Sequence, residues 1–142
     1  MVASENLMMQ LKVFEGLLLK ATRDVGGVLT IGYGHTGKDV QEGDKITEWY
    51  AEELLKQDLS IVESQVRGLK VARTQGQFDA LVSFAFNLGI GNLKKSTLLK
   101  VIRSGGSRNQ IKAEFKRWVY AAGKKMRGLE KRREWEARRF FE

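Results

Sequence analysis

The stretch FEGLLLKATRDVGGVLTIGYGHTG, residues 14–37, decides the fold of this chain. Val25-Gly-Gly-Val28 is a turn signal, and the β-branched and apolar residues 28–31 are typical of a strand. Together with residues 17–21 they predict a small β-hairpin near the N-terminus. The same stretch holds two acids, Glu15 and Asp24, and the single histidine of the chain, His35.

The segments on either side of this hairpin are helical. Ser4 is a typical N-cap, apolar residues then recur at three- and four-residue spacing, and Gly16 ends the predicted helix over 5–15. Residues 34–46 are Gly-rich and polar, which indicates a loop or an irregular strand. From Thr47 the pattern predicts helices to the end of the chain, starting after Thr47 and Thr74 and spanning 96–103, 108–120 and 128–141. A hairpin beside a helix bundle is an α+β fold, mainly helical.

Length and composition fit one domain. A chain of 142 residues can bury a real hydrophobic core but is short for two domains. It has no cysteine and one histidine, which excludes disulfides, thiolate metal sites and histidine-rich metal sites. No apolar run is long enough for a transmembrane helix, and the start does not resemble a secretory signal. We therefore expect synthesis in the cytoplasm without a signal peptide.

Positive charge is concentrated in the second half of the chain. Residues 94–142 contain 16 basic and 5 acidic residues, whereas residues 1–93 carry a small net negative charge. This asymmetry favours a polyanionic partner such as nucleic acid, anionic lipid or an anionic cell-wall polymer. A basic helical nucleic-acid-binding module, or a cationic protein that disrupts walls or membranes, is therefore an alternative function. Solvated helix faces would give the same pattern.

The acids of the opening stretch suggest a hydrolytic site. Glu15 lies in the last turn of its helix among apolar neighbours, where the dipole and desolvation disfavour the charged carboxylate. Asp24 precedes a glycine turn, where water and backbone amides stabilise the ionised form. Two carboxyls in such different environments are typical of glycoside hydrolysis, and the Thr30 hydroxyl could position a water molecule. Taken singly, however, each residue also has a structural explanation as a helix end, a turn former or a strand residue.

Four blocks of the sequence together resemble the phage lysozymes of glycoside hydrolase family 24, the endolysin muramidases. The blocks are EGLLLKATRDVGGVLTIGYGHTG (15–37), ITEWYAEELLKQDL (46–59), TQGQFDALVSFAFNLGIGNLKKSTLL (74–99) and EFKRWVYAAGKKMRGLEKRREWE (114–136). The resemblance implies a lysozyme-like fold over a single domain, 1–142. A hairpin lobe (about 16–46) and a larger helical part (1–15 and 47–142) would flank an active-site cleft.

The resemblance also implies an activity and its catalytic residues. The expected reaction is hydrolysis of the β-1,4 bond between N-acetylmuramic acid and N-acetylglucosamine in bacterial peptidoglycan, which causes cell lysis. Glu15 would be the general acid. Asp24 would stabilise the oxocarbenium-like transition state and, with Thr30, orient the attacking water. An inverting enzyme of this kind needs about 6.5–9.5 Å between its two carboxyls. No cofactor or metal is expected.

Further residues follow from the same resemblance. His35 is expected to form a structural ion pair with Asp58, outside the chemistry. The candidate substrate-binding residues are Gly34, Phe86, Asn87 and Ser96, whereas Trp118 is expected in the core. The expected partner is peptidoglycan, bound by a monomer without nucleic acid or stable membrane insertion. A protein without an apolar anchor would need another route from the cytoplasm to the wall.

Overall fold

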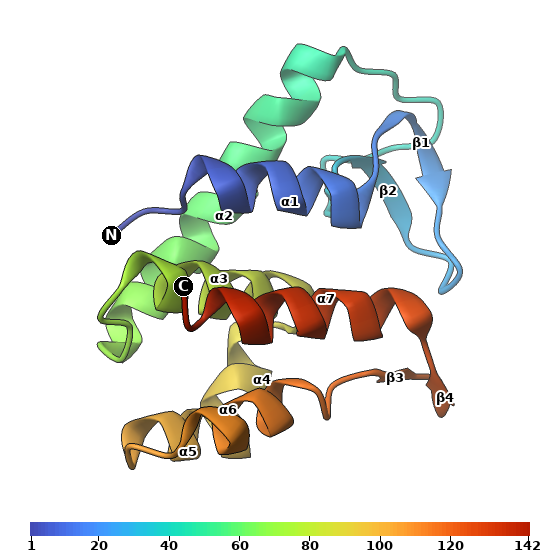
Figure 1. Cartoon of the computed structure of the whole chain (residues 1–142). Coiled ribbons are helices and arrows are strands. Elements are labelled where there is room, and N and C mark those ends of the chain that lie inside the picture. Colours follow the sequence, from blue (N-terminus) through green and yellow to red (C-terminus); the bar gives the residue numbers. More distant parts are fainter. The chain divides into compact units, whose positions relative to one another are not determined.

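The computed structural model describes all residues, 1–142, and contains seven α-helices and two antiparallel pairs of strands (Figure 1). The prediction of a mainly helical α+β fold is confirmed. No helix has both the length and the apolar character needed to cross a membrane. The elements, in chain order, are α1 (Glu5–Glu15), β1 (Leu18–Arg23), β2 (Leu29–Gly32), α2 (Glu48–Leu69), α3 (Gln75–Leu88), α4 (Ile90–Lys95), α5 (Thr97–Arg103), α6 (Arg108–Phe115), β3 (Tyr120–Ala121), β4 (Lys124–Lys125) and α7 (Arg127–Arg139).

The chain forms two compact units. One is continuous and comprises Met8–Ile61, while the other combines Met1–Leu7 with Val62–Glu142. The boundaries fall inside α1 and α2, so both helices contribute residues to both units. The organisation of residues 1–142 as a single domain stays a prediction.

The β1–β2 hairpin of the Met8–Ile61 unit lies where the sequence predicts it, with each strand shifted by one or two residues. Thr22 pairs with Thr30 and Arg23 with Leu29. The turn closes where the amide of Asp24 donates to the carbonyl of Val28 (2.9 Å). Within this turn Gly27 has a φ of +81°, which is unfavourable for a residue with a Cβ.

A small apolar core supports this hairpin. Its buried members are Ala21, Ile31, Val40 and Leu54, with Leu29 and Ile46 packed against them. The loop that follows β2 returns along β1, because the amide of Ile46 donates to the carbonyl of Leu19 (2.9 Å). The hairpin is thus held from both sides, by the core and by backbone hydrogen bonds to the loop.

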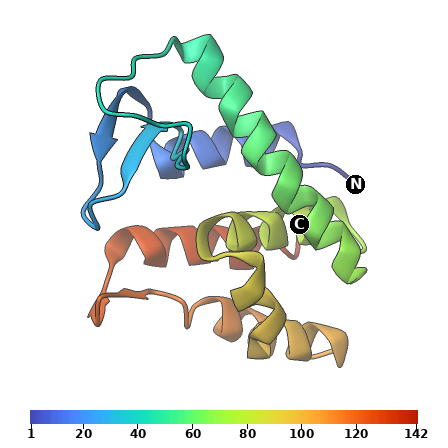
Figure 2. The same ribbon diagram turned by 180° about the vertical axis from the view of Figure 1, so that it is seen from behind.

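Helix α3 is the most deeply buried helix of the second unit, as its apolar sequence predicts. The Thr74 side chain caps it by accepting from the amide of Gln77, and a continuous run of its residues is buried. It lies beside α7, and α6 packs against both α5 and α7 (Figure 1). Figure 2 shows α4 and α5 following α3 from the opposite side. The ring of Phe84 on α3 makes edge-to-face contacts with Phe115 and Trp118.

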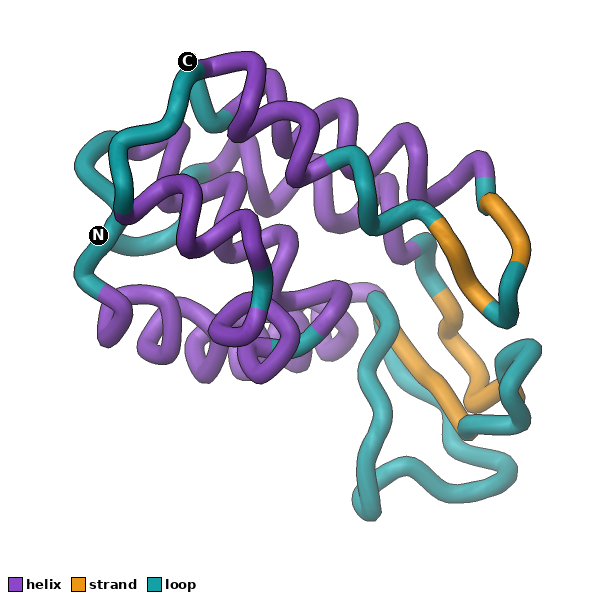
Figure 3. The backbone as a smooth tube through the Cα atoms, turned by 90° about the horizontal axis from the view of Figure 1, so that it is seen from below, coloured by secondary structure: helices purple, strands orange, loops and turns teal.

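The prediction that the chain is helical from Thr47 to its end is wrong at one place. Helix α6 ends at Phe115 rather than at residue 120, and a second hairpin, β3–β4, follows (Figure 3). Ala122 and Gly123 both have positive φ, which is the requirement of a two-residue hairpin turn with the right twist. Each of these strands consists of only two residues, and all four residues are exposed. Such short strands leave no alternating pattern in the sequence.

Two smaller differences concern helix boundaries. The two glycines at 89 and 91 are typical of a helix break, but α4 begins directly after Gly89. Helix α7 spans 127–139 instead of 128–141, which is within the ordinary variation of helix ends.

Buried Asp79 on α3 anchors the N-terminal segment. It accepts hydrogen bonds from the amide of Ser4 (3.1 Å), from the Ser4 hydroxyl and from Gln75 Nε2 (2.8 Å). Arg139 of α7 forms an ion pair with it at 2.8 Å. The Asp79 side chain is 0% exposed, so one carboxylate joins the first residues, α3 and the last helix.

Candidate active site

Glu15 is the last residue of α1 and is half-buried. The helix ends there because Gly16 has a φ of +71° and its amide returns to the carbonyl of Lys12 (3.0 Å). Gly34 lies directly against the Glu15 carboxyl, since a Cβ at this position would be 2.5 Å from Oε1 of Glu15. Gly34 also has a φ of +78°, a backbone conformation that favours glycine. A side chain at this position would therefore be strained and would displace the Glu15 carboxyl.

Asp24 is exposed at the head of the hairpin turn. Its Oδ1 accepts a hydrogen bond from the amide of Val28 at 2.8 Å. The neighbouring Arg23 guanidinium is engaged elsewhere, with the carbonyl of Gly27 (2.9 Å) and with Glu42 (2.7 Å). The Asp24 carboxylate is thus oriented by the backbone while its charge is left available at the surface.

Thr30 lies on β2 and is 9% exposed. Its hydroxyl donates to the carbonyl of Val28 at 3.1 Å. Because a hydroxyl has one proton, this bond leaves Thr30 as an acceptor toward any other partner. Val28 therefore holds both side chains: its amide binds Asp24 and its carbonyl binds Thr30. The sequence offered no signal for this role, because it belongs to the backbone.

His35 lies between two carboxylates. Its Nδ1 is 2.7 Å from Oδ2 of Asp58, and its Nε2 is 2.9 Å from Oδ2 of Asp39. Burial alone would lower the pKa of His35, but the hydrogen bonds and charges of Asp58 and Asp39 outweigh it and raise the pKa above 6.5. The hydrogen bond with His35 lowers the pKa of Asp39 below its usual 3.8. The sequence pointed to Asp58 but not to Asp39.

The hydrogen-bonded group of His35, Asp58 and Asp39 is expected to stabilise the protein in a limited pH window. A raised histidine pKa contributes stability that is complete below about pH 6.5 and is lost as pH rises through the folded-state value. The lowered pKa of Asp39 contributes stability above about pH 4 that is lost as pH falls through its own folded-state value. Coupling between His35→Asn and Asp58→Asn in urea unfolding should be about 2 kcal/mol near pH 5.5 and much smaller at pH 9. Additive effects at every pH would exclude the ion pair.

The remaining substrate-binding candidates lie in the other unit. Asn87 and Phe86 are half-buried near the end of α3, and Oδ1 of Asn87 accepts from Nη2 of Arg133 at 2.9 Å. Ser96 is 4% exposed, and its hydroxyl accepts from the amide of Leu99 (3.0 Å) and donates to the carbonyl of Leu93 (2.7 Å). Ser96 therefore caps α5 and has already donated its hydroxyl proton. Trp118 is half-buried against Phe84.

Comparison with known proteins identifies the family. Residues 12–136 match the family model described as phage lysozyme, which covers most of the chain. The chain belongs to the phage lysozyme family. The resemblance that the four sequence blocks suggested is thereby confirmed.

Relatives and solved structures of phage lysozyme type agree with this assignment. The chain is 47% identical over 134 residues to the endolysin of Bacillus phage B103, covering 92% of this chain and 51% of that protein. The endolysin from Escherichia coli O157:H7 phage FAHEc1 superimposes with a TM-score of 0.89 at 36% identity, covering 100% of this chain and 94% of that one. The muramidase domain of SpmX from Asticaccaulis excentricus gives 0.87 at 33% identity, covering 98% and 97%. The chain spans about half the length of the Bacillus phage endolysin it matches.

One buried cluster of this chain was not predicted from the sequence. Arg133 and Glu136 of α7 have 0% exposed side chains and form an ion pair at 2.7 Å. The Ser83 hydroxyl donates to Glu136 Oε2 at 2.6 Å. Burial lowers the pKa of Arg133 and raises that of Glu136, while the attraction between their charges opposes both shifts. A run of charged residues on a helix normally predicts a solvated face, so the sequence gave no warning of this burial.

Proposed function

We propose that the protein is a muramidase that hydrolyses the β-1,4 bond between N-acetylmuramic acid and N-acetylglucosamine in bacterial peptidoglycan. The observation that carries the proposal is the arrangement of Glu15, Asp24 and Thr30 in one hairpin unit of a phage lysozyme. The acid ends a helix, and the carboxylate and the hydroxyl share Val28. A structural neighbour named as a muramidase domain supports it.

In the proposed mechanism Glu15 acts as the general acid. Its carboxyl donates a proton to the glycosidic oxygen as the bond to the sugar breaks, and the sugar ring acquires oxocarbenium character. Gly34 leaves the space that this carboxyl occupies, because a Cβ there would lie 2.5 Å from Oε1. General acid catalysis requires the carboxyl to come within hydrogen-bond distance of the glycosidic oxygen.

Asp24 and Thr30 orient the water in this mechanism. A water molecule donates one hydrogen to the Asp24 carboxylate and the other to the Thr30 hydroxyl oxygen, which is an acceptor because its own proton binds Val28. The water oxygen then faces the anomeric carbon. The water attacks the face opposite the leaving group and passes one proton to the Asp24 carboxylate, which gives inversion. For this the Glu15 and Asp24 carboxyls must be about 6.5–9.5 Å apart.

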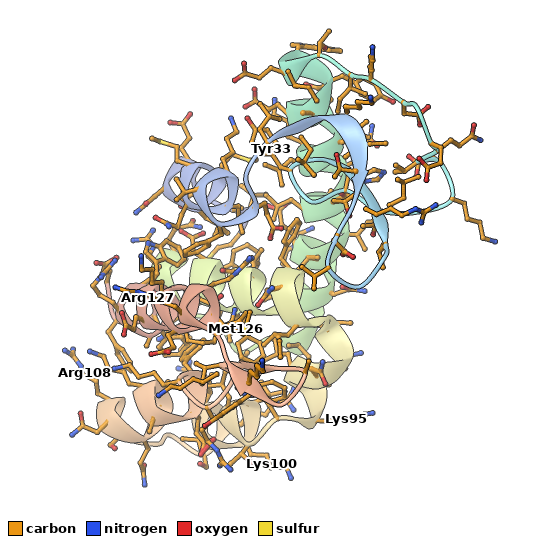
Figure 4. The ribbon with its side chains drawn as sticks, turned by 90° about the vertical axis from the view of Figure 1, so that its right-hand side faces the viewer. Tyr33, Lys95, Lys100, Arg108, Met126 and Arg127 are labelled. Carbon is orange, nitrogen blue, oxygen red and sulfur yellow. The ribbon has the colours of Figure 1, made fainter.

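The basic half of the chain suits an anionic wall. Exposed Lys95, Lys100 and Arg108 project from α4, α5 and α6 (Figure 4). In this proposal the monomer acts on peptidoglycan, and its positive charge increases its local concentration at the wall. Nucleic acid has no part in it, and the protein reaches the wall after release from the cytoplasm where it is made.

Product analysis tests the function and the stereochemistry separately. Purified sacculi treated with the protein should release muropeptides whose new reducing ends are N-acetylmuramic acid, detected by borohydride reduction and mass spectrometry. Reducing-end N-acetylglucosamine, or peptides freed from sugar, would contradict the proposed bond specificity. Proton NMR of the first products should show the α-anomer. An initial β-anomer would exclude the inverting mechanism but not the muramidase function.

A further inference from the structure

The buried pair of Arg133 and Glu136 has a partner that reaches the surface. Besides Glu136, the Arg133 guanidinium contacts the carbonyl of Trp118 (Nη1, 3.5 Å) and lies over the Phe84 ring at 5.2 Å from its centroid. Its Nη2 donates to Glu136 Oε2 (3.0 Å) and to Asn87 Oδ1 (2.9 Å). Of the two side chains that accept hydrogen bonds from Arg133, Glu136 is completely buried and Asn87 is half-buried.

Stability is a poor explanation for such a pair. Removing an arginine and a glutamate from water is costly, and well-packed apolar residues of similar volume are often as stabilising or more so. A fully buried pair that ends on a half-buried amide is better explained by the geometry that it imposes on that amide. Arg133 is fixed on three sides, by Glu136, Phe84 and the Trp118 carbonyl, so it holds Asn87 in one orientation.

The chemistry of arginine determines which end of the Asn87 amide is held. A guanidinium has only donors, so the amide must turn its oxygen toward Arg133 and its nitrogen away from it. Nδ2 therefore remains as the donor of Asn87. A carbonyl acceptor is its natural partner, and N-acetylated sugars carry one in each acetamido group.

We propose that Arg133 and Glu136 are positioning residues, which fix Asn87 so that its Nδ2 donates to the acetamido carbonyl of an N-acetylated sugar in the substrate. The inference rests on the proposed muramidase function, since it concerns recognition of that substrate. Arg133 and Glu136 themselves touch no sugar and act through Asn87.

A variant that removes the pair without removing stability tests this directly. Arg133→Met/Glu136→Leu replaces both charges with apolar side chains and should keep the melting temperature or raise it. Its apparent KM on purified sacculi should rise about tenfold, which corresponds to about 1.4 kcal/mol, with kcat changed less than about twofold. Asn87→Ala should have the same effect, and the triple variant should show no further increase in KM.

Arg139→Met is the matched control. Arg139 lies on the same helix and also pairs with a buried acid, Asp79, but has no contact with Asn87. Its loss should lower the melting temperature and leave KM unchanged. An unchanged KM in the pair variant, effects of the pair variant and Asn87→Ala that multiply, or an equal rise in KM in Arg139→Met would overturn the proposal.

NMR of the wild type provides a readout that needs neither a variant nor activity. The Asn87 Nδ2 signals should show restricted motion and should shift when tri-N-acetylchitotriose is added. A mobile side chain or an absent shift would reject the positioning role. Wild-type protein that shifts these signals but releases no muropeptide would instead reject the muramidase function and leave the sugar contact standing.

Discussion

Replacement of Glu15 by glutamine is expected to lower the rate of muropeptide release by about three orders of magnitude. Glutamine has the same shape as glutamate and fits the space against Gly34, but it has no proton to donate to the glycosidic oxygen. The fold should be retained, because the two side chains have the same shape. Turbidity loss of outer-membrane-permeabilised bacteria and muropeptide release measure the effect.

Glu5→Gln is the control for this experiment. Glu5 is an exposed acid in the first turn of the same helix, and its replacement removes the same charge without touching the site. If Glu15→Gln clears cells as fast as wild type, the catalytic assignment is wrong. Clearance that depends on low salt instead of on Glu15 would favour a cationic wall- or membrane-disrupting protein.

Replacement of Asp79 by alanine is expected to cost about 3–5 kcal/mol of folding free energy. The change removes the buried partner of Arg139, whose side chain is only 15% exposed and keeps only the longer contact with Glu142 (3.4 Å). It also removes the acceptor for the amide and hydroxyl of Ser4. For a chain of this size the melting temperature should fall by about 10 °C or more. Urea unfolding and calorimetry measure both quantities.

Glu42→Ala gives the matched comparison. Glu42 also pairs with an arginine, Arg23, but both side chains are more than half exposed. Exposed pairs contribute little, so the loss should be below about 1 kcal/mol. If Asp79→Ala costs no more than Glu42→Ala, the buried network does not anchor the N-terminal segment.

Much of the fold could be predicted from local patterns in the sequence. The helix over 5–15, the turn at residues 25–28 and the start of α3 after Thr74 all follow from caps, glycines and apolar spacing, and these depend on neighbours in sequence. The hydrolytic site was different. Glu15, Asp24 and Thr30 each have an ordinary structural explanation, and only their occurrence with the later blocks pointed to catalysis.

Features made by distant partners could not be predicted. Asp39 joins His35 only because the loop folds back, and Arg133 is enclosed by Phe84, Asn87 and Glu136, which are distant or unremarkable in the sequence. In the sequence RGLEKRREWEARR nothing separates buried charges from solvated ones. The β3–β4 hairpin was not predicted because strands of two residues are too short to show a periodic pattern in the sequence.

The Asp79 network also has a consequence for synthesis of the chain. The partners of Asp79 include Ser4 and Arg139, so the network cannot form until α7 has left the ribosome. The unit of residues 8–61, whose contacts are closer in sequence, can form earlier. During synthesis the segment around Ser4 would therefore leave the ribosome early but reach its native contacts late.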